Sequence, residues 1–481
     1  MVSTLIAPGL PAPAFEGVPT PHEYREYLSL LLNTLFVART DRVPLSEANG
    51  RILAQDISAR MDVPSFDNSQ MDGYALTAGA AERENRLFTV GREIPAGKPL
   101  LRSRASDDLT YPIMTGAPIP KGYDLVIPVE QSERIEYPDL PESYGRPSET
   151  IKLATGTVGQ FVRRKGEDVQ AGQLLARRGE RITPALVGTL AAQGYSHVPV
   201  NAGPRVLVCT GGDEIRSELD NPQVREELEP GQIYDANGPM LAALLQEDGA
   251  TVHRIAIGDN PDALVERLRR ECVDFKPDIV LTSGGISHGK YEVMRLALTK
   301  SAPALGLPVI TNWFGHVSQQ PGGPQGVSVL DIDLHTTELR PLRATGTKGQ
   351  LIPIISVPGN PVSTLISYVM LVRPVLRNEL LHGVKTSEHQ ARRAVLSLTH
   401  LPEVDRVHGT PAAKTQFMRG TLKSVEVEPG VYRHEAQPDL HAGSHLLHRA
   451  AEADILIEME PNTTYTGGEV VRYYPLRYPA V

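Results

Sequence analysis

The clearest pattern of apolar and polar positions lies between residues 204 and about 380. Short apolar runs such as PRVLVCT, TVHRIAI and LIPIISV alternate there with longer stretches of helical periodicity such as PDALVERLRREC. Buried parallel strands are continuous apolar runs, and strands alternating with helices of this length are typical of a doubly wound sheet. We therefore predict a parallel α/β domain over residues 201–385.

The flanking segments have other patterns. Residues 22–35 have helical periodicity, and a second helix is predicted from Ser46, a candidate N-cap. Short apolar runs bounded by Gly and Pro predict strands from 61 to 154 and from about 390 onward. The expected fold class is therefore multidomain, with α+β and α/β parts. The expected parts are a flexible Pro-rich leader (1–20), a linking α/β domain I (21–60 plus 155–200), a β-rich domain II (61–154), the α/β domain III (201–385) and a β-barrel-like domain IV (386–481).

Composition narrows the function classes. The formal net charge is −9, which argues against nucleic acid as the main partner. No apolar run reaches the length of about 18 residues that a membrane span needs, and the leader has no signal-peptide pattern. The two cysteines, Cys209 and Cys272, have neither disulfide-framework nor metal-ligand spacing. We expect a cytoplasmic protein in which Cys209 is a buried small side chain rather than a nucleophile.

Three glycine-containing loops follow predicted strands of the α/β domain: Thr210–Glu214, Ser283–Ser287 and Pro358–Ser363. In a doubly wound sheet, ligands bind beyond the carboxyl ends of the strands, where glycine lets the backbone approach and helix amides favour an anion. Three such loops, each with a hydroxyl or carboxylate residue, favour a phosphate-bearing ligand. Any one loop alone is equally well explained as a tight βα turn.

A second group of polar residues precedes the α/β domain. Segment 64–75 carries Asp67 and Asp72 among turn-forming residues, and 114–120 and 163–168 are further turn-like segments. Carboxylates from separate loops can converge on a divalent cation, and the basic triplet that opens 163–168 can attract an anion. Ordinary turns explain the same residues, and a solvated charged face is the favoured explanation of the triplet.

The run PSFDNSQMDGYAL, residues 64–76, resembles the hallmark segment of the MoeA and gephyrin-E family. Seven further segments are similar to that family's motifs and occur in the same order: MTGAPIPKGYDLVIPVE, RRKGEDVQAGQLL, TPALVGTLAAQGYSHVPV, TGGDEI, GQIYDANGPML, SGGISHG and VPGNPVS. The resemblance spans about residues 21–480, which is nearly the whole chain.

This resemblance implies four domains, with a MogA-like central α/β domain flanked by β-rich domains, in an elongated homodimer. The active cleft would lie between the α/β domain of one subunit and the Asp72-bearing domain of the other. The implied activity is that of a molybdopterin molybdenumtransferase, which takes adenylylated molybdopterin and molybdate, with Mg²⁺ or another divalent cation, and releases AMP. Molybdopterin adenylyltransferase and molybdoenzymes are the implied partners.

Site residues follow from the resemblance position by position. It implies catalytic roles for Asp72, Asp168, Glu214 and Glu292, and metal binding by Asp72, Glu214 and Glu292. The implied substrate-binding residues are Thr115, Ser283, Gly284, Gly285, Ser287, Pro358, Gly359, Asn360, Ser363, Arg419 and Ser444.

Two departures from the family pattern bear on function. Glu292 stands where an aspartate is usual, and the Lys-Pro-Gly-Lys-Pro motif is replaced by 320–324, in which Gln320 and Gly323 take the places of both lysines. These changes fit a transferase with an altered oxyanion site, or a gephyrin-like scaffold that binds a protein partner and has lost activity. The retained Asp72 and Glu214, among others, favour the enzyme.

Overall fold

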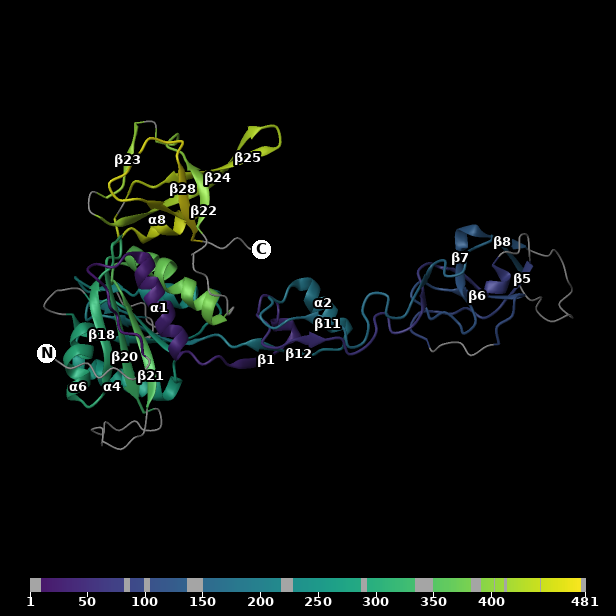
Figure 1. Ribbon diagram of the computed structural model, residues 1–481, viewed down its shortest axis with the longest axis horizontal. Coiled ribbons are helices and arrows are strands. Elements are labelled where there is room, and N and C mark those ends of the chain that lie inside the picture. Colours follow the sequence, from purple (N-terminus) through teal and green to yellow (C-terminus); the bar gives the residue numbers. More distant parts are fainter. Residues whose placement is uncertain are drawn as a thin grey trace. The chain divides into compact units, whose positions relative to one another are not determined.

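The computed structural model describes residues 10–81, 87–98, 104–135, 150–217, 228–286, 292–333, 349–381, 391–401, 403–410, 413–441 and 443–476 (Figure 1). The chain divides into two compact units. Unit 1 is Met1–Thr40 with Asn201–Val481, and unit 2 is Asp41–Val200. Within the described ranges, every helix is too short or too polar to cross a membrane.

The first helix, α1 (Pro21–Leu35), is fixed at its start by a capping box. The Glu23 N–H donates to the Thr20 hydroxyl at 3.2 Å, and the Thr20 N–H donates to the Glu23 carboxylate at 2.7 Å. Tyr24, Leu28 and Leu31 form a buried stripe at helical spacing. This stripe packs on strand β21 and on the helical segment 361–381 of unit 1. α1 therefore packs within unit 1, on its α/β part.

The predicted α/β domain is confirmed, and its sheet lies in unit 1. The strands run in the order β16-β13-β17-β21-β20-β18. Their bounds are Arg205–Gly211 (β13), Thr251–Ile257 (β16), Ile279–Ser283 (β17), Val309–His316 (β18), Pro324–Ile332 (β20) and Gln350–Val357 (β21). The first four strands in this order pair in parallel, while β20 and β18 are antiparallel additions at one edge. The carboxyl ends of β13, β17 and β21 thus lie side by side.

Two hydrophobic cores cover the two faces of this sheet, as buried parallel strands require. One face carries α4 and the short helices after β17, and the other carries α1, α3 and the segment from α7 onward. The helix bounds are Asn237–Glu247 (α3), Pro261–Phe275 (α4), Val293–Leu296 (α5), Ala297–Ser301 (η5), Ala302–Ala304 (α6), Pro361–Ser367 (α7), Tyr368–Val372 (η6) and Val375–Leu381 (η7).

The described part of the leader packs on unit 1. The Phe15 ring lies 5.3 Å from the Trp313 ring and 5.6 Å from the Tyr27 ring, centroid to centroid. Leu10 is buried, and the Ser318 N–H donates to the Pro19 carbonyl at 2.7 Å. The expected flexible leader is therefore not found over residues 10–20.

The C-terminal part of unit 1 is a closed barrel. Strand β24 pairs with both β25 and β26, and the ring closes through β22 and β28. The bounds are Gln319–Gln320 (β19), Arg392–Leu396 (β22), Val407–His408 (β23), Thr415–Glu428 (β24), Val431–Pro438 (β25), Leu447–Glu452 (α8), Ile455–Met459 (β26), Thr464–Tyr465 (β27) and Val470–Pro475 (β28). Strands β24 and β25 form a hairpin that turns at Gly430, where φ is +78° (Figure 1).

Unit 2 holds a six-stranded sheet in the order β7-β4-β6-β5-β9-β8. Its strands are Gly73–Leu76 (β4), Leu87–Val90 (β5), Leu109–Ile113 (β6), Leu125–Pro128 (β7), Ser132–Ile135 (β8) and Thr150–Leu153 (β9). The hallmark segment 64–76 forms β3 (Asn68–Ser69), a tight turn and then β4. The β-rich character predicted for 61–154 is thus present in the described part of that range.

The rest of unit 2 is a smaller cluster of short elements around Leu53, Leu190 and Val200. They are Thr40–Pro44 (β1), Leu45–Glu47 (η1), Ile57–Ser58 (β2), Leu174–Ala176 (β11), Pro184–Ala192 (α2) and His197–Asn201 (β12). Strand β10 (Val162–Arg163) lies outside this cluster and pairs with β3. The helix predicted from Ser46 was wrong, because a single 3₁₀ turn is followed by bends and isolated bridges. Gly50, at φ +79°, stops the helix that the apolar spacing predicted.

Candidate functional site

A cavity of about 800 Å³ lies at the carboxyl ends of the parallel strands of unit 1. Its walls include residues from all three glycine loops that the sequence singled out, so the structure brings these loops together. The lining residues of these loops are Thr210, Gly211, Gly212, Glu214, Ser283, Gly284, Gly285, Pro358, Gly359, Asn360 and Ser363. Ser287, the remaining predicted residue of the second loop, lies outside the described residues.

The floor of the cavity is a close contact between two of these loops. A Cβ atom added at Gly359 would lie 3.3 Å from the Gly284 Cα, so a side chain at position 359 would crowd the opposite loop. Below them, the buried Ser283 hydroxyl donates to the Pro358 carbonyl at 3.0 Å and lies 3.1 Å from the Thr364 hydroxyl. The Ser283 side chain therefore supports the floor from inside the protein.

A second network joins the β13 loop to the start of α3. The Asp235 carboxylate accepts the Gly238 N–H at 2.9 Å and the Thr210 hydroxyl at 2.7 Å, and Arg254 lies 3.4 Å away. A Cβ atom at Gly238 would lie 2.3 Å from this carboxylate and 2.7 Å from the Thr210 hydroxyl. Glycine is therefore required at position 238 for the strand end and the helix start to meet.

Further carboxylates line the same cavity. Glu214 folds back over Gly212, and Glu292 stands at the N-terminal end of α5. Asp259 exchanges backbone-to-carboxylate hydrogen bonds with Asp213, at 3.1 and 3.3 Å. These oxygen groups are the ligands that Mg²⁺ prefers. Among the described residues, however, no three His, Cys, Asp or Glu side chains are already grouped to hold a metal ion.

The barrel contributes one wall of the cavity through the loop that contains Ser444 and His445. The Ser444 carbonyl accepts the Val362 N–H at 3.0 Å, and an Arg419 amine donates to the Leu446 carbonyl at 2.7 Å. Arg419, a predicted substrate-binding residue, is buried and does not line the cavity, but it holds this loop in place. Among the described lining residues, His445 is the one side chain that can carry a positive charge.

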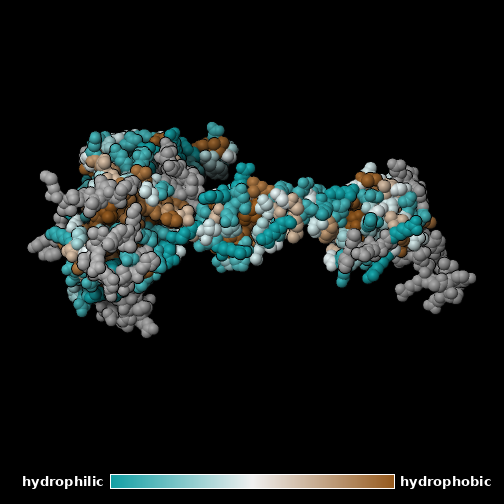
Figure 2. All heavy atoms as spheres, turned by 60° about the horizontal axis from the view of Figure 1, so that its bottom comes forward, coloured by the Kyte–Doolittle hydropathy of each residue, from teal (hydrophilic) through white to brown (hydrophobic). Residues whose placement is uncertain are grey.

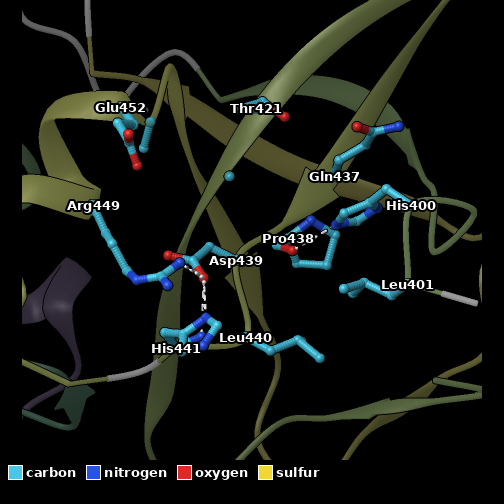
Figure 3. Close-up of a pocket in the computed structure, with 12 residues that line it drawn as sticks. His400, Leu401, Thr421, Gln437, Pro438, Asp439, Leu440, His441, Arg449 and Glu452 are labelled. Carbon is cyan, nitrogen blue, oxygen red and sulfur yellow. Dashed lines mark hydrogen bonds and ion pairs between the residues drawn. The ribbon is translucent and has the colours of Figure 1, made fainter. Parts of the chain in front are cut away.

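A smaller cavity of about 370 Å³ lies within the barrel (Figure 3). Asp439 stands at its centre, with the His441 ring nitrogen 2.9 Å and an Arg449 amine 3.6 Å from the same carboxylate oxygen. Burial opposes ionisation of Asp439, but the hydrogen bonds from His441 and the charges of Arg419 and Arg449 together lower its pKa. Asp439 thus lies in the wall of this smaller cavity and beside Arg419, the residue that holds the Ser444 loop.

In unit 2, two predicted site residues lie in direct contact. Strand β4 pairs with β6 so that Gly73 is opposite Ile113, which places Asp72 beside the turn 114–116. One Asp72 carboxylate oxygen accepts the Thr115 N–H at 2.6 Å and the Thr115 hydroxyl at 2.8 Å. The bond from the Thr115 N–H, followed by that from its hydroxyl, lowers the pKa of Asp72.

The basic triplet of unit 2 is largely neutralised. Arg164 lies 2.8 Å from the Asp67 carboxylate, and Lys165 lies 3.1 Å from that of Asp62. This pairing agrees with the favoured explanation of a charged surface rather than an anion site. Asp168, which closes the same turn, is exposed on unit 2.

The lining residues that sequence reasoning missed include Asp235, Asn237, Asp259 and His445. Asp259 follows strand β16 as Glu214 follows β13, so the rule that places ligands beyond strand ends could have identified it. Asp235 and Asn237 lie in the run GQIYDANGPML, which was used only as a motif. His445 comes from another domain, and no local signal connects it to the α/β loops.

Comparison with known families covers most of the chain. Residues 22–194 match the family model described as the MoeA N-terminal region (domain I and II). Residues 207–378 match a model described as a probable molybdopterin binding domain, and residues 408–476 match the MoeA C-terminal region (domain IV). The middle match contains every strand that surrounds the large cavity.

Individual relatives match this chain over most of their length. The chain is 36% identical over 411 residues to molybdopterin molybdenumtransferase 2 of Mycobacterium tuberculosis, covering 83% of this chain and 87% of the relative. It is 32% identical to the molybdopterin molybdenumtransferase of Synechococcus elongatus, over 71% of this chain and 76% of that one. A solved structure of a molybdopterin biosynthesis MoeA protein from Pyrococcus horikosii superposes with a TM-score of 0.68 at 25% identity, covering 96% of this chain and 100% of that chain.

Proposed function

Because the chain belongs to the MoeA family, we propose that it is a molybdopterin molybdenumtransferase that inserts molybdate into adenylylated molybdopterin and releases AMP. The observation that carries this proposal is the 800 Å³ cavity, in which three glycine loops meet at the carboxyl ends of parallel strands. This is where doubly wound folds hold phosphate-bearing ligands, and the volume suits a nucleotide-sized molecule.

The carboxylates on the cavity wall fit a divalent cation of the Mg²⁺ type. Mg²⁺ is usually held by one or two carboxylates together with substrate phosphates, so a complete protein cage is not required. Glu214, Asp259 and Glu292 are the candidates in unit 1. When bound, the cation would neutralise phosphate charge during cleavage of the phosphoanhydride. The side chains themselves orient the cation and keep other anions at a distance.

Ser363 and His445, which line the same cavity, are the candidates for contacts with the anion. Ser363 and the His445 loop flank the turn 320–324, where this chain has no lysine. We propose that His445 takes part in holding the oxyanion in this chain. Hydrogen bonds from the anchored loop would position molybdate beside the pterin dithiolene.

Asp72 and Thr115 complete the proposed machinery from unit 2, together with Asp168. As in the arrangement implied by the family resemblance, we propose a homodimer in which these residues serve the cavity of the partner subunit. Molybdopterin adenylyltransferase, as supplier of the substrate, and molybdoenzymes, as acceptors of the product, are the proposed partners in the cytoplasm.

The test is AMP release from adenylylated molybdopterin with magnesium and molybdate, comparing the unmodified chain with Glu292→Ala and Glu292→Asp. We expect release by the unmodified chain and by Glu292→Asp, and a loss of roughly a hundredfold or more for Glu292→Ala. If the unmodified chain releases no AMP with either molybdate or tungstate, the transferase proposal fails. A gephyrin-like scaffold would then be the better hypothesis, since the chain is 29% identical to the gephyrin of Dictyostelium discoideum.

A further inference from the structure

Asn237 is a buried lining residue to which nothing above gives a role. It is the first residue of α3 and is 8% exposed. Its side-chain nitrogen donates to the Ser283 hydroxyl at 3.0 Å and to the Gly359 carbonyl at 2.7 Å. One amide group therefore joins the helix start to the loops after β17 and β21.

The orientation of this amide is set by its partners. The Gly359 carbonyl can only accept a hydrogen bond, so the side-chain nitrogen must face it. The side-chain oxygen of Asn237 is buried and has no hydrogen-bond partner among the described residues. All hydrogen bonding by this side chain is thus concentrated in two donations, both directed at the floor of the cavity.

Asn237 adds to the direct bonds between these loops, in which the Gly284 N–H donates to the Val357 carbonyl at 3.0 Å and the Ser283 hydroxyl donates to the Pro358 carbonyl at 3.0 Å. Gly284 and Gly285, with φ of +95° and +67°, have no side chains to pack, and neither does Gly359. The distance between the Gly284 and Gly359 backbones therefore depends on bonds made below the floor, and Asn237 makes one to each loop.

We propose that Asn237 is a positioning residue that keeps the two glycine loops at the spacing required to bind the AMP-bearing half of the ligand. This inference rests on the proposed function, because it assumes that the cavity binds a nucleotide. In the folded protein, loss of the two donations leaves the Gly359 carbonyl without its protein donor and lets the floor open. The consequence is weaker ligand binding at nearly unchanged overall fold.

The test compares Asn237→Asp and Asn237→Ala with the unmodified chain, measuring AMP affinity by calorimetry and melting temperature by circular dichroism. Asn237→Asp has the same shape and keeps the oxygen that has no partner, but it replaces the donor with an acceptor. Asn312→Asp is the matched control, since Asn312 is exposed on β18 and its side-chain oxygen, kept in aspartate, accepts the Ser328 hydroxyl at 2.7 Å. We expect both Asn237 variants to bind AMP at least roughly tenfold more weakly, and the control to bind normally.

Each result has a distinct meaning. If the unmodified chain does not bind AMP, the proposed function fails. If it binds AMP and both Asn237 variants bind it equally well, whatever their melting temperatures, Asn237 is merely structural and the inference is overturned. If Asn237→Asp binds AMP weakly but Asn237→Ala binds it normally, the inference is also overturned, because repulsion between the new carboxylate and the phosphate would then explain the weak binding. Should Asn237→Asp fail to fold, the uncharged Asn237→Ala still decides between these results.

Discussion

Asp72 accepts both the N–H and the hydroxyl of Thr115 at a single carboxylate oxygen, across 43 residues of sequence. The contact holds the carboxylate in one orientation. It keeps Asp72 ionised at lower pH than an ordinary aspartate. A fixed, charged carboxylate on an exposed turn is suited to contact a cation or a ligand supplied from elsewhere.

Thr115→Val should raise the pKa of Asp72 toward the ordinary value of about 3.9, because one of the two hydrogen bonds that favour the ionised form is lost. Thr115→Ser keeps the hydroxyl and should leave the pKa low. The measurement is an NMR titration of the Asp72 carboxyl carbon. An unchanged titration in the valine variant would show that the backbone N–H alone sets the pKa.

A mixture of inactive variants should regain activity if each cavity is completed by the partner subunit. Asp72→Ala and Glu214→Ala remove groups from different units of the chain. After the subunits are exchanged at equal concentration, half of the dimers are mixed and each has one intact site, so AMP release should reach about a quarter of the unmodified rate. Mixtures that stay as inactive as the separate variants would exclude a shared site.

Two helical glycines should respond in opposite ways to the same substitution. Gly238→Ala brings a methyl group against the Asp235 carboxylate and the Thr210 hydroxyl, so it should lower the free energy of unfolding by about 1–3 kcal/mol and weaken ligand binding. Gly188, exposed in α2, has no atom within 4 Å of an added Cβ. Gly188→Ala should therefore stabilise unit 2 by about 0.5–1 kcal/mol. Urea unfolding of both variants measures these changes in the free energy of unfolding. If both variants were stabilised or both destabilised, the packing argument would be contradicted.

The barrel should lose stability on acidification through Asp439. Its pKa is lowered in the folded state, so its contribution is fully present above the unfolded pKa of about 3.9 and is lost as the pH falls through the folded-state pKa. Asp439→Asn should cost about 1–3 kcal/mol near pH 7, and this difference should disappear in acid. Chemical unfolding at several pH values tests this. A difference that stays constant with pH would assign the cost to packing rather than charge.

Removal of the His445 side chain should weaken the binding of molybdate and of AMP, since His445 is the one side chain on the described cavity wall that can carry a positive charge. We expect His445→Ala to reduce affinity by about fivefold to fiftyfold, as for loss of one hydrogen bond to a charged group. His448→Ala is the control, because His448 is 87% exposed on α8 and outside the cavity. Equal affinities for both variants would remove His445 from the proposed site.

Much of the α/β domain was predictable because its signals are local. The apolar runs at 205–211, 251–257 and 279–283 became strands at almost the predicted bounds, and the glycine loops after β13, β17 and β21 share one cavity. The carboxyl ends of parallel strands meet at one edge, so the sequence was enough to group them.

The other features of the fold and site could not be predicted from local patterns, because they depend on contacts between segments that are distant in the sequence. The amphipathic pattern of α1 predicts a helix but does not say which core covers it, and the helix packs on strands more than 300 residues later in the chain. Strands β20 and β18 have the same apolar pattern as the parallel strands, so their sequences did not indicate that they pair antiparallel. His445 and Arg419 reach the cavity region only because the barrel docks its 443–446 loop on Val362.

The packing of α1 also has a consequence for synthesis of the chain. The Tyr24 hydroxyl donates to the Gly326 carbonyl, 302 residues later, and Arg25 donates to the Met370 carbonyl, 345 residues later. At roughly 5–20 residues per second, the ribosome needs tens of seconds to produce these partners after α1 has emerged. Throughout that interval the buried stripe of α1 has no native surface to cover it. Although α1 precedes these partners in the chain, it is therefore among the last helices to be covered, and the nascent chain exposes an apolar face during that interval.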